Sequence, residues 1–298
     1  DLTELILSYL TIEDKFRLQC LNRRINGLVF SKQSVLTVSE SEDKRNTNLL
    51  IINRKSSEEL IDWLNKVLKR LKFLRELNLQ FNCQAIDSRV LDTIQTNCRY
   101  LRSIWFNKSI FRDISEDCLS RFGEEVGHKL KTLTIESCIW KNGEEVVTYE
   151  ELNRLLATLL SRLPILQRLS YHSNPYKFLW HNYLPVLTNS SANRLKNLSE
   201  MNISYGIDYQ SIRRFSDHYC KQIKSIVLTL NTNDFVCEDL NNCLSQISRY
   251  ESLERLSLTI KHKTEGKLFL IDNGIQELND RLTKLLKLEL IMMTKDIA

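Results

Sequence analysis

The segment "LKTLTIESC", residues 130–138, contains the pattern from which the fold can be inferred. Its apolar residues Leu130, Leu133 and Ile135 follow the spacing L-x-x-L-x-L. Side chains alternate between the two faces of a strand, so Leu133 and Ile135 share one face and Thr134 points to the other. The segment therefore predicts a short strand with one buried face and one polar face.

The same triad of apolar residues occurs eight times along the chain. Successive triads start 27, 29, 36, 32, 25, 30 and 32 residues apart, and leucine fills sixteen of the 24 positions. The triads begin at Leu74, Leu101, Leu130, Leu166, Leu198, Ile223, Leu253 and Leu285. This regular self-similarity is typical of repeat proteins, whose units bury their apolar edges only by stacking.

Segments with helical spacing of apolar residues precede most triads, as in residues 60–71, where Ser57 is placed to cap a helix. The combined pattern resembles the leucine-rich-repeat family, over roughly residues 70–298. The resemblance implies an α/β solenoid, or horseshoe, in which each helix returns the chain and covers the leucines. The competing interpretation is an ordinary α/β domain with leucine-rich strands, although its strands need longer apolar runs.

The repeat pattern favours Asn or Cys three residues beyond each triad, where these side chains bond to turning backbone. Asn82, Cys138, Asn174 and Asn231 match that preference, whereas Ser109, Gly206, Lys261 and Met293 depart from it. The apolar tail "LKLELIMMTKDIA" leaves the last repeat without a polar cap. We expect the native chain to continue there, or a partner to cover that end.

The first thirty residues do not repeat. Thr11 is placed to cap a helix beginning near Ile12, Asn22 is placed to cap another, and an apolar stripe precedes both. Three short helices form a very small core, and such a segment tends to need a partner.

The order of residues in "LILSYLTIEDKFRLQCLNRRINGLVF", residues 5–30, resembles an F-box. The family's opening Leu-Pro is absent, consistent with truncation before Asp1, and Ile25 replaces its usual tryptophan with a smaller contact area. The resemblance implies binding to a Skp-type adaptor of a cullin–RING ubiquitin ligase. The apolar residues that it assigns to adaptor contact are Leu5, Ile6, Leu10, Leu18, Leu21 and Ile25. These residues can also pack the three helices together.

If both resemblances hold, the repeats bind a protein substrate on the concave face of their strands. Trp105 is the main candidate, because a solvent-facing tryptophan often anchors a partner, although a terminal loop could instead cover it. Arg168 and Arg255 can meet an acidic or phosphorylated segment, or simply form a solvated face. The predicted substrate-binding residues are Asn78, Trp105, Thr134, Arg168 and Arg255.

The sequence has no motif for catalysis, phosphate binding or metal binding. His residues and the eight cysteines lack metal-ligand spacing, and only seven glycines occur, without a phosphate-binding loop. We therefore expect no enzyme activity, no cofactor and no metal. Buried free thiols suit a reducing, cytoplasmic or nuclear setting. With a net charge of +5 and basic residues scattered beside acidic ones, nucleic acid is not an expected partner. No apolar run is long enough to span a membrane.

The predicted organisation has three parts. Residues 1–31 form the F-box-like segment, and residues 32–72 form a linking strand and helix, with Val35, Leu36 and Val38 in an incomplete entry repeat. Residues 73–298 hold about eight repeats, cut short at the C-terminal end. We interpret the chain as a substrate-recognition subunit of an SCF-type ubiquitin ligase. The alternatives are a leucine-rich-repeat scaffold unrelated to ubiquitin ligases, or an extracellular repeat receptor.

Overall fold

A computed structural model represents the chain. It describes residues 10, 14–15, 33–39, 49–51, 57–81, 85–173, 195–204, 209–231, 237–262 and 272–294. Most of the F-box-like segment lies outside the described residues; within it, Asp14 and Lys15 have helical backbone. The chain divides into two compact units, Asp1–Val147 and Thr148–Ala298.

The first unit is built on a parallel sheet whose strands follow the predicted triads. Its strands, in the order β2–β1–β3–β5–β7, are β2 (Leu49–Ile51), β1 (Val35–Ser39), β3 (Glu76–Gln80), β5 (Ser103–Asn107) and β7 (Thr132–Asn142). Leu77, Ile104 and Leu133 are register partners across three strands, and all three are buried. Burying one such side chain stabilises a fold by about 2 kcal/mol.

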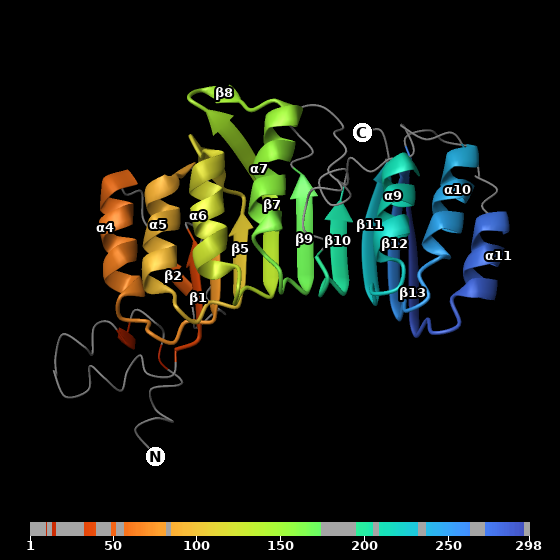
Figure 1. The fold of residues 1–298 in the computed structure, drawn as a ribbon, viewed down its shortest axis with the longest axis horizontal. Coiled ribbons are helices and arrows are strands. Elements are labelled where there is room, and N and C mark those ends of the chain that lie inside the picture. The colour runs from red at the N-terminus through yellow and green to blue at the C-terminus, as the bar shows by residue number, and fades with distance from the viewer. Residues whose placement is uncertain are drawn as a thin grey trace, which may run out of the picture. The chain divides into compact units, whose positions relative to one another are not determined.

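Helices pack against one face of this sheet (Figure 1). They are α4 (Ser57–Leu68), α5 (Ser88–Asn97) and α6 (Glu116–Val126), and α5 contacts both of the others. Capping side chains fix where two of them begin: Asp87 accepts a hydrogen bond from Val90 N–H at 3.1 Å, and Ser115 accepts one from Cys118 N–H at 3.2 Å. The other face of the sheet therefore carries the alternate, polar side chains.

A second, smaller sheet lies where the strands of the first unit end. It consists of β4 (Ala85–Ile86), β6 (Ile110–Arg112), the second half of β7, and β8 (Glu145–Val146), which is antiparallel to β7. Phe111 stacks on Trp140 with ring centroids 4.1 Å apart, and Phe106 packs edge-on against Phe111 at 5.1 Å. All three rings are buried, so they form an aromatic cluster in the core of the first unit.

Cys138 and Ser109 occupy the equivalent position three residues beyond two of the triads. Cys138 Sγ lies 3.3 Å from the carbonyl oxygen of Phe106, as the Asn-or-Cys pattern predicts. Ser109 departs from that pattern in sequence but has the same role, because its hydroxyl donates to Asn107 O at 3.0 Å and accepts from Phe81 N–H at 3.4 Å. Both positions therefore link a turn to the preceding repeat.

Each of these links follows a residue with left-handed backbone. Lys108 has φ of 50° and Ser137 has φ of 54°, which turn the chain out of the strand before Ser109 and Cys138. Burial raises the pKa of the Cys138 thiol to about 12, so the thiol stays protonated and can donate a hydrogen bond at neutral pH.

The second unit repeats the strand-and-helix arrangement of the first. Its parallel strands, in chain order, are β9 (Arg168–Ser173), β10 (Glu200–Ser204), β11 (Ser225–Asn231), β12 (Arg255–His262) and β13 (Lys287–Thr294). Its helices are α7 (Tyr149–Ser161), α9 (Tyr209–Tyr219), α10 (Cys237–Ile247) and α11 (Asp272–Arg281). Each strand pairs in register with the next, so both units have the predicted α/β class with repeated parallel strands.

The eighth triad lies in a different environment from the other seven. Leu288 and Leu290 are exposed, because β13 is the last strand among the described residues and pairs with β12 alone. Leu286, just before β13, is 83% exposed. The predicted strand is present, but its apolar side chains are not buried.

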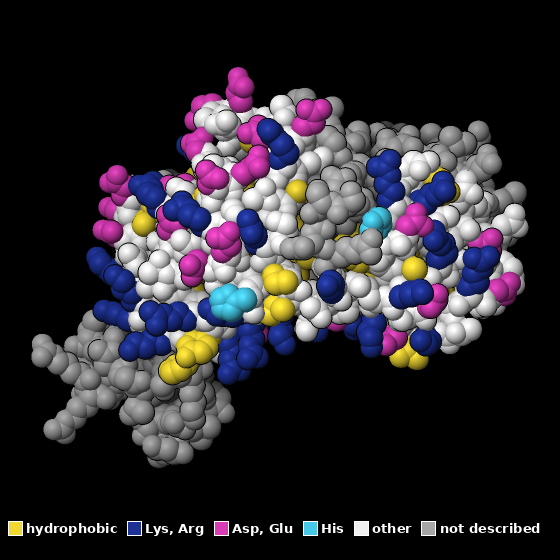
Figure 2. Space-filling view, viewed as in Figure 1, with side chains coloured by type: hydrophobic (Ala, Val, Ile, Leu, Met, Phe, Trp, Pro, Cys, Tyr) yellow, Lys and Arg dark blue, Asp and Glu magenta, His cyan; other side chains and the backbone are white. Residues whose placement is uncertain are grey.

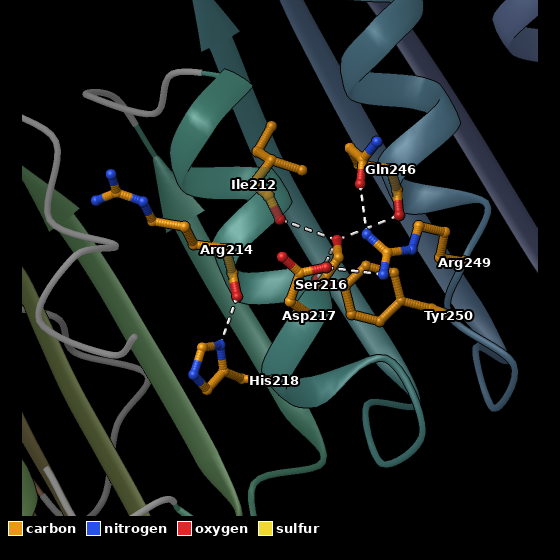
Figure 3. Close-up of polar contacts among 8 residues, drawn as sticks. All are labelled: Ile212, Arg214, Ser216, Asp217, His218, Gln246, Arg249 and Tyr250. Atoms are coloured by element: carbon orange, nitrogen blue, oxygen red, sulfur yellow. Dashed lines mark hydrogen bonds and ion pairs between the residues drawn. The ribbon is translucent and has the colours of Figure 1, made fainter. Parts of the chain in front are cut away.

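Buried polar contacts join α9 to α10 and to the turn that follows α10 (Figure 3). The Ser216 hydroxyl lies 2.9 Å from Ile212 O, 3.2 Å from Gln246 O and 3.2 Å from Tyr250 Oη. Nearby, Arg249 Nη2 pairs with Asp217 Oδ1 at 2.7 Å. Tyr250 is fully buried, and burial raises its pKa above the ordinary value of a tyrosine. These contacts fix the separation of two helices in adjacent repeats.

Two further observations concern cysteines and membranes. Cys98, Cys118 and Cys138 are free and buried, as the sequence predicts for thiols packed as small hydrophobes. Within the described ranges, no helix combines the length and the apolar character needed to cross a bilayer.

We predict that Ser109→Ala lowers the free energy of unfolding by about 1–2 kcal/mol, because Phe81 N–H loses its partner in a buried position. Ser109→Cys should cost less, since a thiol can replace the hydroxyl as it does at residue 138. Urea denaturation measures both changes. Ser103→Ala, on the helix-free face of β5, is the control. Equal losses at residues 103 and 109 would contradict the assigned role.

We predict that Tyr250→Phe lowers the free energy of unfolding by about 1 kcal/mol, because Ser216 loses a buried hydrogen-bond partner. The control is Tyr100→Phe, at a tyrosine that is 55% exposed, which should change stability by less than about 0.5 kcal/mol. Thermal and urea unfolding of the two variants test the difference, and indistinguishable curves would show that the cluster contributes nothing.

Candidate functional site

The helix-free face of the first unit's sheet carries three of the predicted substrate-binding residues. Asn78, Trp105 and Thr134 are register partners on β3, β5 and β7, so their side chains lie side by side in one row. The rows on either side are also polar; they contain Glu76, Ser103 and Thr132, and Gln80, Asn107 and Glu136. The structure thus brings these three predicted residues together.

Trp105 is the one large apolar side chain in this part of the face. The indole is 41% exposed, so it is neither packed in the core nor fully covered. Its neighbours across the strands are Asn78 and Thr134, and its neighbours along β5 are Ser103 and Asn107. An exposed aromatic ring within a polar frame is the usual form of a binding hot spot.

The amides beside the indole have unused hydrogen-bonding capacity. Among the described residues, Asn78 Oδ1 and Asn107 Oδ1 are buried and have no hydrogen-bond partner. A buried acceptor without a donor costs about 1–3 kcal/mol, so a donor supplied to either oxygen would be stabilising. The face around Trp105 therefore combines an apolar anchor with two unused acceptors.

The other two predicted residues lie in the second unit and face a carboxylate. Arg168 Nε lies 3.1 Å from Glu200 Oε2, and Arg255 Nη2 lies 3.4 Å from Glu200 Oε1. Arg255 reaches Glu200 across Ser225, the residue between them in the row, because the serine side chain is short. Glu200 therefore neutralises part of the positive charge of Arg168 and Arg255, which the sequence predicts to meet an acidic partner.

Almost all of the predicted adaptor-binding residues lie outside the residues that the structure describes. Leu10 is half-buried in a bend. Leu5, Ile6, Leu18, Leu21 and Ile25 lie outside the described residues. Lys15, in the same segment, is buried and donates a hydrogen bond to Gln33 Oε1 at 3.0 Å, and burial lowers the pKa of its ammonium group.

Sequence reasoning missed the pairing of Glu200 with both arginines. The signal was available, because Arg168, Glu200 and Arg255 occupy the same position in their respective repeats. In-register stacking makes equivalent positions into neighbours, so opposite charges in one column predict an ion pair.

The described residues contain no group of three or more His, Cys, Asp or Glu side chains placed to hold a metal ion. The first unit displays an indole, amides and hydroxyls on its sheet face, and the second unit displays ion-paired charges. Each set is suited to contact with a macromolecule.

Comparisons with known proteins do not assign the chain to a family. No model of a protein family matches it, and no curated protein matches it. Among solved structures, it is similar to the Rad7 and Elc1 complex in yeast, with 16% sequence identity and a TM-score of 0.46. The match covers 77% of this chain, which spans only 60% of the other chain. A likeness this distant carries no conclusion about function or partners.

Proposed function

We propose that the chain is a substrate-recognition subunit of an SCF-type ubiquitin ligase, working in the cytoplasm, the nucleus or both. In this proposal residues 1–31 bind a Skp-type adaptor, and the helix-free face of the repeats binds the protein to be ubiquitinated. The chain has no catalytic role; it raises the effective concentration of substrate near the ligase. We also propose that the repeats form a leucine-rich-repeat solenoid whose sheet is curved.

Two separate observations support the two halves of the proposal. The F-box resemblance of residues 5–30 supports adaptor binding. The exposed Trp105, between Asn78 and Thr134 and beside two unused amide acceptors, supports recognition of a protein on the sheet face. The second observation carries the proposal that this face binds a partner.

The adaptor half is tested by co-purification of the tagged chain with a Skp-type adaptor. We predict that Leu21→Asp lowers adaptor capture by about tenfold or more, because a charge enters the apolar contact stripe. Leu286→Asp is the matched control: it makes the same chemical change at a leucine that is 83% exposed, and should leave adaptor capture unchanged. Capture of adaptor by a folded Leu21→Asp variant at the wild-type level would contradict this half.

The substrate half uses the same purification, followed by identification of the proteins bound to the chain. Trp105→Ala should remove a bound protein that wild type retains, without changing adaptor capture. Val146→Ala, at another exposed apolar residue of the first unit, should retain it. A Trp105-dependent protein without any captured adaptor would indicate a scaffold unrelated to ubiquitin ligases. Identical bound proteins in all variants would contradict recognition through this face.

A further inference from the structure

The loops that lead from helix to strand in the first unit are unusually basic. They comprise residues 69–75, 98–102 and 127–131, and together contain eight Lys and Arg residues and no Asp or Glu. We call this set of loops the basic edge. Figure 2 shows Lys and Arg side chains gathered along this border of the first unit, and Asp and Glu side chains gathered toward the opposite border.

The backbone brings equivalent basic residues together. Arg102 N–H donates to Arg75 O at 2.7 Å, and Lys131 N–H donates to Arg102 O at 2.7 Å. Arg75, Arg102 and Lys131 thus follow one another along the edge at the strand spacing of about 4.8 Å. Lys72 and Arg99 occupy a second equivalent position, two residues before the first leucine of their triads. Residues 27 or more apart in sequence therefore form one surface.

Five of these eight charges are not neutralised by any described residue. Lys72, Arg75, Arg99, Arg102 and Lys131 are exposed, and none of them forms an ion pair in the part of the chain that the structure describes. Like charges on neighbouring strands repel one another, so their concentration opposes folding. An external anion is the natural counter-charge for such a surface.

An exposed pair of aromatic rings lies within the basic edge. Phe73 and Tyr100 stack with ring centroids 5.7 Å apart, and they are 49% and 55% exposed. Phe73 lies between Lys72 and Arg75 in sequence, and Tyr100 follows Arg99. Flat apolar surface and cationic groups therefore occur at the same place.

Helix dipoles do not account for this charge. The negative ends of the three helices favour nearby cations, but Lys66 is the one basic residue that lies in a last helical turn. The second unit has the same backbone bonds along its equivalent edge, where the residues matching Arg75 are Gln167, Ser199, Lys224, Glu254 and Leu286. Of these, Lys224 is paired with Glu254 at 3.1 Å. The fold thus needs no basic residues at these positions.

We propose that the basic edge binds single-stranded nucleic acid, with Lys and Arg side chains on the phosphates and the Phe73–Tyr100 pair stacking on a base. Such sites combine a cationic path for the backbone with aromatic faces for the bases. An acidic protein partner fits less well, because lysine is depleted at protein–protein interfaces, whereas lysine and arginine both neutralise phosphate. A count of charges along the sequence gives no indication of this edge, whereas alignment of the repeats places Arg75, Arg102 and Lys131 at one equivalent position.

The test is fluorescence anisotropy of the full chain with a labelled twelve-nucleotide oligo-dT or oligo-U over a salt series from 50 mM. The triple variant Arg75→Glu/Arg102→Glu/Lys131→Glu should weaken binding by about tenfold or more and reduce the salt dependence by about 0.7 per lost phosphate contact. The matched control, Lys196→Glu/Lys221→Glu/Lys284→Glu, makes the same change in net charge on exposed loops of the second unit. It should bind within about twofold of wild type.

A second variant separates stacking from charge. Phe73→Ala/Tyr100→Ala should weaken binding by about fivefold or more and leave the salt dependence unchanged. Circular dichroism checks that each variant is folded. The proposal is overturned by no binding at 50 mM salt, by equal losses in both triple variants, or by unchanged affinity in the aromatic variant. Displacement of the oligonucleotide by a polyglutamate peptide at equal or lower concentration would assign the edge to an acidic protein and also overturn it.

Discussion

In-register pairing of short parallel strands is the constraint on which the other features of this protein depend. A single repeat buries one face of a five-residue strand and leaves its backbone groups and one apolar edge unsatisfied. The next strand satisfies both, through a register that aligns Leu77 with Ile104 and Ile104 with Leu133. Ser109 accepts a hydrogen bond from Phe81 N–H and Cys138 donates one to Phe106 O, so each of these turns is linked to the preceding repeat. Each unit therefore gains its stability from contacts between repeats.

The same constraint decides where functional surfaces can occur. With helices on one face of the first unit's sheet, the other face displays rows of side chains from equivalent positions, among them Asn78, Trp105 and Thr134. The loops before the strands form a separate edge, where Arg75, Arg102 and Lys131 stand in line. The two surfaces differ in chemistry, one polar with an exposed indole and the other cationic with a stacked aromatic pair. They can consequently be tested with independent variants.

Much of the fold follows from sequence because the triad is a local pattern. Position, spacing and leucine content located a strand at each of the eight triads, and the alternation of apolar residues with polar Thr37 located the strand at Val35–Ser39. The features that the sequence did not predict depend on contacts with residues about thirty positions away. Ser109 departs from the Asn-or-Cys pattern in sequence, and its role depends on a hydrogen bond that its hydroxyl accepts from Phe81 N–H in the preceding repeat. Arg168 and Arg255 seemed free because their partner, Glu200, lies on a different strand from either. For the adaptor-binding stripe, the sequence resemblance remains the basis of the prediction.

Disulfide cross-linking measures the register directly, because a disulfide requires Cα atoms about 4.4–6.8 Å apart. Ser103 and Thr132 are register partners on β5 and β7, whereas Ser103 and Glu136 are offset by four residues on the same two strands. Under mild oxidation, mass spectrometry of Ser103→Cys/Thr132→Cys should identify a disulfide between the two introduced cysteines. Ser103→Cys/Glu136→Cys should give none. A disulfide in the offset pair, or in neither pair, would contradict the parallel in-register stacking on which both proposed surfaces depend.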